Sequence, residues 1–330
     1  MNERTLKRRT LLGCAAAALV PVRALAEESP AAWPTRPIKL VAGYPAGGSA
    51  DAQARLIATK LGEVLHQPVI VENRPGAAGG ISADIVAKAP ADGYTVLLAA
   101  SSIFAINPWL YKKLSFDVQR DLALVGQVAS FQSVVLVPVG SPYKTLADVI
   151  ADARTHPNKV SYGSPGSGTA AHLSAELLRS VSKAQIVHVP YKGDAPLLSD
   201  LIGAQVPLAF VNMQPSLPLI EAGKVRVLAV TGARRSPNLP HVPTIEEQGF
   251  PGTGVNGWSG LAVRTGTPPV IVGKLSNALR DVLRSPDVRE KLFAQAAEPH
   301  FSDPAEFTRF AAAERQRFGV VIREAGITGD

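Results

Sequence analysis

The sequence predicts an α/β protein of two lobes, each with a mixed sheet flanked by helices, and a cleft between the lobes. Short apolar runs rich in β-branched residues alternate with runs of helical periodicity along most of the chain, which is typical of sheets covered by helices. This alternation gives more strands than one small sheet needs, and 330 residues suffice for two lobes. Two α/β lobes therefore fit the pattern better than one.

The first elements illustrate the assignment. The apolar run 38–44, IKLVAGY, predicts a strand. Ala54, Ile57, Leu61 and Val64 then recur at helical spacing and predict a helix. Thr145 is a typical N-cap before an apolar run and predicts another helix. By the same reasoning the remaining strands are 68–73, 94–101, 132–139, 159–163, 185–191, 206–212 and 225–231, and the remaining helices are 79–89, 145–155, 169–180, 194–203, about 270–295 and 303–325.

The C-terminal third completes the layout. The passage 236–269 is rich in Pro and Gly and carries no predicted element. The helices beyond it have no predicted strands of their own, so we expect them to pack back on the first lobe. The first lobe is therefore expected to be discontinuous, with residues 27–136 and 256–330, and the second lobe to hold residues 137–255.

Residues 1–26 are typical of a secretory signal peptide. Lys7, Arg8 and Arg9 precede the apolar run LLGCAAAALVPV, which is too short to span a bilayer, and Ala24-Leu25-Ala26 forms an A-x-A cleavage site. RRTLL also resembles a twin-arginine signal, and LLGC resembles a lipoprotein cleavage box. The sequence thus predicts an exported protein of the periplasm.

Composition excludes several classes of function. Loss of the signal peptide lowers the net charge from +7 to +3, and no cluster of Lys and Arg remains, so we expect no nucleic-acid partner. Cys14 is the only cysteine and lies in the signal peptide, which leaves no disulfide, catalytic thiol or thiolate metal site. No two of the six histidines are three or four residues apart, so we expect no metal site. We expect no cofactor either. No later run of 18 apolar residues occurs, which predicts a soluble mature chain.

Two glycine-rich turns join a predicted strand to a predicted helix. GYPAGGSAD spans 43–51 and YGSPGSGTAAHL spans 162–173, and neither contains a Lys or Arg. Glycine lets backbone N–H groups approach a ligand closely, and a helix N-terminus adds unpaired N–H donors and a positive dipole end. One such turn from each lobe is therefore expected to bind a small anion in the cleft. A side chain at Gly48 or Gly168 would intrude on that anion.

Other interpretations of these turns are weaker. The second turn lacks the lysine of a phosphate-binding P-loop, and although 166–171 matches G-x-G-x-x-A, no acidic residue for a ribose follows about 20 residues on. No serine has the G-x-S-x-G frame of a hydrolase. Asp51, in the first turn of its helix, favours the helix dipole and is a poor general acid or base. His172 is expected to pack or cap, and the turns themselves to bind rather than merely connect.

Seven motifs in combination resemble the Bug family, the substrate-binding proteins of tripartite tricarboxylate transporters. The resemblance runs from Trp33 to near Ile327 and implies a two-lobed, type II-like periplasmic binding protein. It implies a monomer that closes on a small carboxylate and delivers it to membrane permease subunits, without being an enzyme. The motifs are PAGGSAD (45–51), VENRPGAAG (71–79), APADGYTVLL (89–98), INPWLY (106–111), GSPGSGTAAHL (163–173), VPYKG (189–193) and PTIEEQGFPG (243–252).

The resemblance also implies a set of ligand-binding residues. They lie in the two turns, at the end of the 94–101 strand and at the end of the 206–212 strand. They are Tyr44, Ala46, Gly47, Gly48, Ser49, Asp51, Ser101, Ser102, Ser164, Gly166, Ser167, Gly168, Thr169, His172 and Asn212.

One residue departs from the family pattern. Many members read F-D-N or F-D-G where this chain has Phe210-Val211-Asn212. Val211 is placed near the cleft, where it removes a carboxylate that could accept an ammonium group, which predicts a preference for carboxylates without an amine. Two other functions remain open: a sensory module that presents its ligand to a membrane sensor, and an exported α/β hydrolase, for which no triad is evident.

Overall fold

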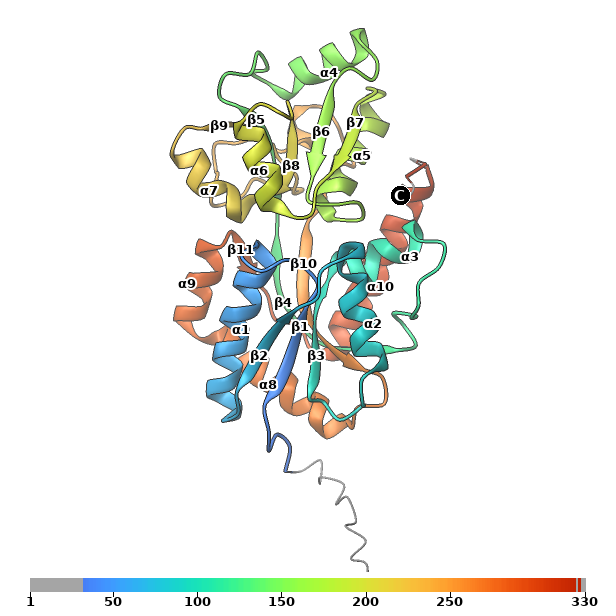
Figure 1. Cartoon of the computed structure of the whole chain (residues 1–330), viewed down its shortest axis with the longest axis vertical. Helices are drawn as coiled ribbons and strands as arrows, with labels where there is room; N and C mark the ends of the chain where they lie inside the picture. The colour runs from blue at the N-terminus through green and yellow to red at the C-terminus, as the bar shows by residue number, and fades with distance from the viewer. Residues whose placement is uncertain (1–31, 325, 328–330) are drawn as a thin grey trace, which may run out of the picture.

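The computed structural model describes residues 32–324, 326 and 327, so the predicted signal peptide lies outside the described residues. Two mixed sheets, each flanked by helices, form two lobes (Figure 1), which confirms the predicted fold class. The strands are β1 (Ile38–Ala42), β2 (Val69–Asn73), β3 (Thr95–Ala100), β4 (Leu122–Phe131), β5 (Ser133–Pro138), β6 (Ser161–Ser164), β7 (Val187–Pro190), β8 (Ala209–Asn212), β9 (Val225–Val230), β10 (Gly257–Arg264) and β11 (Ala297–Pro299). The α-helices are α1 (Ser49–Leu65), α2 (Gly80–Lys88), α3 (Asn107–Leu110), α4 (Leu146–Thr155), α5 (Ala170–Ser182), α6 (Asp194–Ile202), α7 (Met213–Glu221), α8 (Pro269–Arg284), α9 (Pro286–Ala294) and α10 (Pro304–Glu324), with short 3-10 helices at Ala77–Gly79 and Glu246–Gln248 and a π-helix at Ser102–Ile106.

The first lobe is built on a six-stranded sheet, with the order β11-β4-β10-β3-β1-β2. β1 pairs in parallel with β2 and β3, whereas β10 runs antiparallel to both β3 and β4. Helix α8 packs on α1, and α10 packs on β4, so the C-terminal helices cover a sheet that begins at the other end of the chain.

The second lobe is built on a five-stranded sheet, with the order β7-β6-β8-β5-β9. β6 is parallel to β7 and β8, and β5 is antiparallel to β8 and β9. The loops that follow β7 and β8 therefore leave the same edge of this sheet, and Figure 1 shows that this edge faces the first lobe.

The chain passes between the lobes twice. Gln132 is the single residue between β4 and β5, and the return lies between Val230 and Gly257. The two crossings are bonded to each other: the N–H of Ser133 donates to Thr231 Oγ1 at 3.0 Å, and Thr231 Oγ1 donates to the carbonyl of Val255 at 3.1 Å. The strands thus change sheet at these two places, while the predicted boundaries of the lobes stay a prediction.

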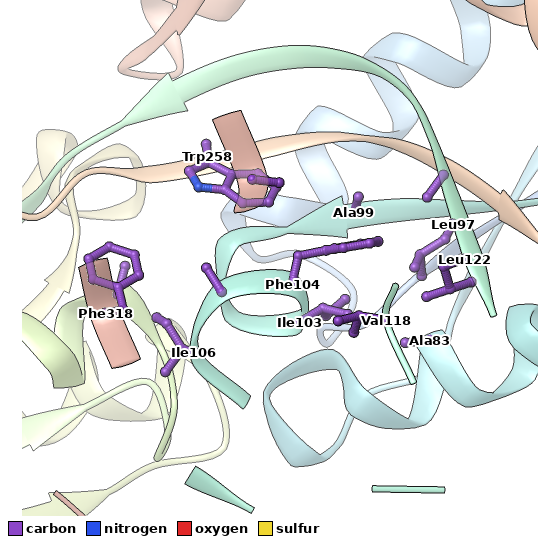
Figure 2. Packing of buried hydrophobic residues seen from close by; sticks show 14 of the residues in the cluster. Ala83, Leu97, Ala99, Ile103, Phe104, Ile106, Val118, Leu122, Trp258 and Phe318 are labelled. Atoms are coloured by element: carbon purple, nitrogen blue, oxygen red, sulfur yellow. The ribbon is translucent and has the colours of Figure 1, made fainter. Parts of the chain in front are cut away.

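One of the two apolar clusters of the first lobe contains Trp258 of β10, which is 1% exposed. Its indole lies edge-on to Phe307 of α10, with centroids 5.3 Å apart, and 6.3 Å from Phe104. Figure 2 shows Trp258 among buried apolar side chains of β3 and of the π-helix that follows it. The C-terminal helix and β10 are thereby joined to the N-terminal half by apolar contact.

The structure also corrects several predicted elements. The passage 236–269 was expected to carry none, but β10 lies in it, and β11 shows that the tail after 269 does have a strand. The helix predicted over 270–295 is two helices, because Ser285 is extended and Pro286 begins a new helix. No strand or helix was predicted where the structure has β4, α3 and α7.

Candidate functional site: a pocket between the lobes

The main candidate site is a cavity of about 120 Å³ where the two lobes meet, room for about eight waters or one small organic acid. It lies beyond the carboxyl ends of strands of both sheets, the usual place for a ligand in α/β proteins. The lining residues are Tyr44, Pro45, Ala46, Gly48, Ser49, Ala50, Gln53, Leu98, Ala99, Ala100, Ser101, Ser102, Phe131, Gln132, Pro165, Thr169, Ala170, Lys192, Gly193, Asp194, Ala195, Pro196, Asn212, Met213, Gln214, Ser259, Gln295, Ala296 and Ala297.

The first glycine turn presents the N-terminus of α1 to this cavity. Gly48 is the N-cap of α1, and no side chain of the described residues caps that end. Gly48, Ser49 and Ala50 all line the cavity. The first N–H groups of a helix have no intrahelical partner and sit at the positive end of its dipole, so this end of α1 can receive an anion.

Asp51 belongs to the turn but stabilises it rather than lining the cavity. Its Oδ2 accepts hydrogen bonds from the N–H of Gly47 and from Nε of Arg55, each at 2.9 Å, and its Oδ1 accepts from Nδ2 of Asn73 at 2.9 Å. Burial opposes ionisation of Asp51, but these hydrogen bonds outweigh it and lower the pKa. Asp51 therefore holds the loop in shape as a carboxylate.

Tyr44 and the serines after β3 form the floor of the cavity in the first lobe. The hydroxyl of Tyr44 hydrogen-bonds Oγ of Ser102 at 2.8 Å, and Ser101 and Ser102 are both buried. Burial raises the pKa of Tyr44 to about 12, so its hydroxyl stays neutral. These groups can offer hydrogen bonds to a ligand without adding charge.

The second glycine turn is largely satisfied by its own side chains. The N–H of Gly166 donates to Ser164 Oγ, and the N–H of Gly168 donates to His172 Nδ1, each at 3.2 Å. His172 stacks on His188, with centroids 4.2 Å apart, and Thr169 caps α5 by accepting from the N–H of His172. The hydrogen bonds of this turn are therefore made mainly within the second lobe, and only Pro165, Thr169 and Ala170 near it line the cavity.

The loop between β7 and α6 is the main contribution of the second lobe, and sequence reasoning missed it. Lys192, Gly193 and Asp194 line the cavity together with the first residues of α6. Of all the described residues that line it, Lys192 and Asp194 alone carry charged side chains. The sequence did carry a signal for this loop. The loop follows the carboxyl end of a predicted parallel strand, which is where ligands bind in open α/β sheets.

The structure thus brings together some of the predicted site residues and separates others. Their role in ligand binding stays a prediction. Those that line the cavity are Tyr44, Ala46, Gly48, Ser49, Ser101, Ser102, Thr169 and Asn212. Those that do not line it are Gly47, Asp51, Ser164, Gly166, Ser167, Gly168 and His172.

The placement of Val211 at the cleft was wrong. Val211 is completely buried in the apolar core of the second lobe, with Val134 and Leu197, and does not line the cavity. Successive side chains of a strand point to opposite faces, and Phe210 is buried in a separate apolar cluster on the other side. The preference argued from Val211 therefore loses its basis.

Gly168→Ala is expected to weaken ligand binding about tenfold, by hindering contact between the lobes rather than by touching the ligand. Gly168 has φ +82°, and a Cβ there would lie 2.9 Å from Oδ1 of Asn107 and 3.3 Å from Cβ of Ala78, both in the first lobe. Gly223→Ala is the matched control, because Gly223 has φ +64° but a Cβ there meets nothing within 4 Å. Calorimetric titration of both variants tests this, and equal affinities would contradict it.

The described residues offer neither a metal-binding cluster nor a membrane-spanning helix. Within residues 32–324, 326 and 327, no group of three or more His, Cys, Asp and Glu side chains could hold a metal ion. In the same part of the chain, no helix has the length and apolar character needed to cross a membrane.

Comparisons with known proteins agree on one family. A model of the tripartite tricarboxylate transporter family receptor matches residues 53–327. BugT of Bordetella pertussis is 36% identical over 295 residues, which cover 89% of this chain and 90% of BugT. A structure of an R. palustris protein with adipate is 39% identical with a TM-score of 0.86, and covers 90% of this chain and 100% of that one. MatC from Rhodopseudomonas palustris with bound malate is 29% identical with a TM-score of 0.81, over 88% and 99% of the two chains.

These matches confirm the resemblance to the Bug proteins, and they extend over nearly the whole described chain. The family is one of substrate-binding receptors, not of enzymes. The chain belongs to the tripartite tricarboxylate transporter receptor family.

Proposed function

We propose that this protein captures a small carboxylate in the cavity between its lobes and presents it to the permease subunits of a tripartite transporter. The observation that carries the proposal is the uncapped N-terminus of α1, which opens into the cavity at Gly48 and Ser49. A carboxylate placed there receives N–H hydrogen bonds and the favourable end of the helix dipole.

The second lobe closes the site from the opposite side. Helices α6 and α7 also begin at the cavity, with Gly193 and Asn212 as their N-caps. Lys192 adds a positive side chain beside them. Because each lobe contributes hydrogen-bond donors to one anion, the anion draws the two lobes together. Binding would thereby change the surface that the protein presents to a permease.

The ligands bound in two related structures support a carboxylate as the ligand. One was solved with adipate and the other, MatC, with malate, and both share this fold over most of the chain. The predicted signal peptide at residues 1–26 supports capture in the periplasm, where a receptor of this family would meet its ligand.

A screen of mono-, di- and tricarboxylates is expected to yield at least one acid that raises the melting temperature. A ligand at a hundredfold excess over its Kd stabilises the folded state by about 2.7 kcal/mol. Differential scanning fluorimetry measures the shift, with the matching amides, which lack the charge, as controls. If the amides stabilise the protein as well as the acids do, the carboxylate is not what the site recognises.

A further inference from the structure

Asp194 is a buried carboxylate that faces the cavity. It is 7% exposed and lines the space where the ligand is proposed to bind. Its Oδ1 accepts from Nδ2 of Asn212 at 3.0 Å, and its Oδ2 accepts from Oγ of Ser49 at 3.3 Å across the gap between the lobes. Among the described residues, each hydrogen bond to this carboxylate comes from a neutral group.

The surroundings of Asp194 make a second anion costly beside it. Burial raises the pKa of Asp194, and the hydrogen bonds from Asn212 and Ser49 offset this only in part. A Cβ on Gly48 would lie 4.0 Å from Oδ2, so this carboxylate also stands close to the proposed anion site at α1. A ligand must therefore direct its own charge away from Asp194 or bring a donor to it.

The same loop carries a charge of the opposite sign. Lys192 lines the cavity two residues before Asp194, and its side chain is exposed, so it can accept an anion without leaving water entirely. A carboxylate near Lys192 and the N-terminus of α1, with a hydroxyl or ammonium group on a neighbouring carbon, would satisfy both charged residues of this loop.

We propose that Asp194 makes this receptor select carboxylic acids that carry a hydroxyl or amino group, because it accepts a hydrogen bond from that group. This inference rests on the proposed function and narrows it to a class of ligand. It reverses the preference that Val211 had suggested, since the carboxylate that the cleft was expected to lack is supplied by Asp194.

The test is calorimetric titration with matched acids of three lengths at neutral pH. The panel is succinate, malate and aspartate; glutarate, 2-hydroxyglutarate and glutamate; and adipate with 2-aminoadipate. Wild type is expected to bind a substituted acid at least about tenfold more tightly than the unsubstituted acid of the same length, the value of one charge-assisted hydrogen bond. Asp194→Asn is expected to bring the two within about threefold of each other.

A matched variant separates selection from general damage. Asp200→Asn makes the same change of charge further along α6, where Asp200 accepts from the hydroxyl of Tyr191 and does not line the cavity. It is expected to keep the wild-type ratio. Because burial raises the pKa of Asp194, the folded protein loses stability once the pH exceeds the ordinary carboxyl range. Asp194→Asn should therefore melt no earlier than wild type at neutral pH.

The outcomes are distinguishable. Wild type that binds the unsubstituted acid as tightly as its substituted partner overturns the role of Asp194 and leaves the proposed function standing. An unchanged ratio in Asp194→Asn does the same. Binding of no acid in the panel overturns this inference, whereas the proposed capture of a small carboxylate fails only if no acid of the wider screen binds either.

Discussion

Gly48→Leu is expected to abolish stabilisation by ligand while leaving the unliganded protein nearly as stable as wild type. Gly48 has φ −84°, which any residue adopts, and a Cβ there would meet nothing nearer than the carbonyl of Pro45 at 3.5 Å. The rest of a leucine side chain would enter the cavity at the N-terminus of α1. At a hundredfold excess of ligand over its wild-type Kd, the loss is about 2.7 kcal/mol.

Gly140→Leu is the control for this experiment. A Cβ on Gly140 meets nothing within 4 Å, and the residue lies in the turn after β5, away from the cavity. Both variants should unfold within about 1 kcal/mol of wild type without ligand, because neither overlaps a neighbour. A Gly48→Leu protein that still shifts its melting temperature with ligand would show that the anion binds elsewhere.

Trp258→Ala is expected to lower the free energy of unfolding by about 3–5 kcal/mol, the largest effect on stability that we expect of a single truncation. The indole is 1% exposed and packs against Phe104 and Phe307. Its removal leaves a void between β10, α10 and the π-helix at Ser102–Ile106, where the C-terminal part of the chain packs on the N-terminal half. Denaturant titration measures the loss.

Phe293→Ala provides the comparison, since this aromatic side chain on α9 is 44% exposed. Its loss should cost about 1 kcal/mol or less. Similar costs for the two truncations would mean that the core around Trp258 relaxes to fill the space, and that β10 is held by its strand pairing instead.

The regular parts of the fold could be predicted because pattern and packing agree there. Of the predicted face of α1, Ala54, Ile57 and Leu61 are buried, as their spacing indicates, whereas Val64 near the end of the helix is exposed. β10 could not be recognised, because Gly257 and Gly260 interrupt an apolar run in a passage rich in Pro and Gly. Those glycines are required by packing: a Cβ on Gly260 would lie 2.3 Å from the ring of Phe307. Such a contact depends on a residue far along the chain.

α7 was missed for a local reason. Two prolines, at 215 and 218, argue against a helix in sequence, but Pro215 falls in the first turn of α7, where no intrahelical N–H bond is lost. The structure tolerates Pro218 further on in the same nine-residue helix. The tertiary setting outweighs the propensity here.

The site could be predicted where it depends on backbone and not where it depends on the direction of side chains. The first turn could be predicted to reach the cavity because it joins the carboxyl end of β1 to the N-terminus of α1. The second turn has the same composition, but its N–H groups are taken by Ser164 and His172. The side to which Val211 points depends on strand register, and the exposure of Asp194 to the cavity depends on how the two lobes meet.

The second sheet can be completed from one uninterrupted stretch, since its strands all lie between Ser133 and Val230. The first sheet cannot, because β10 inserts between β3 and β4 and pairs Ser259 with Ala100. During synthesis, the edges of β3 and β4 that pair with β10 therefore stay unpaired until β10 has left the ribosome. Closing so long a loop is slow, and unpaired edges aggregate. We therefore expect the second sheet to form before the first, and β3 and β4 to be the strands whose edges stay unpaired for longest.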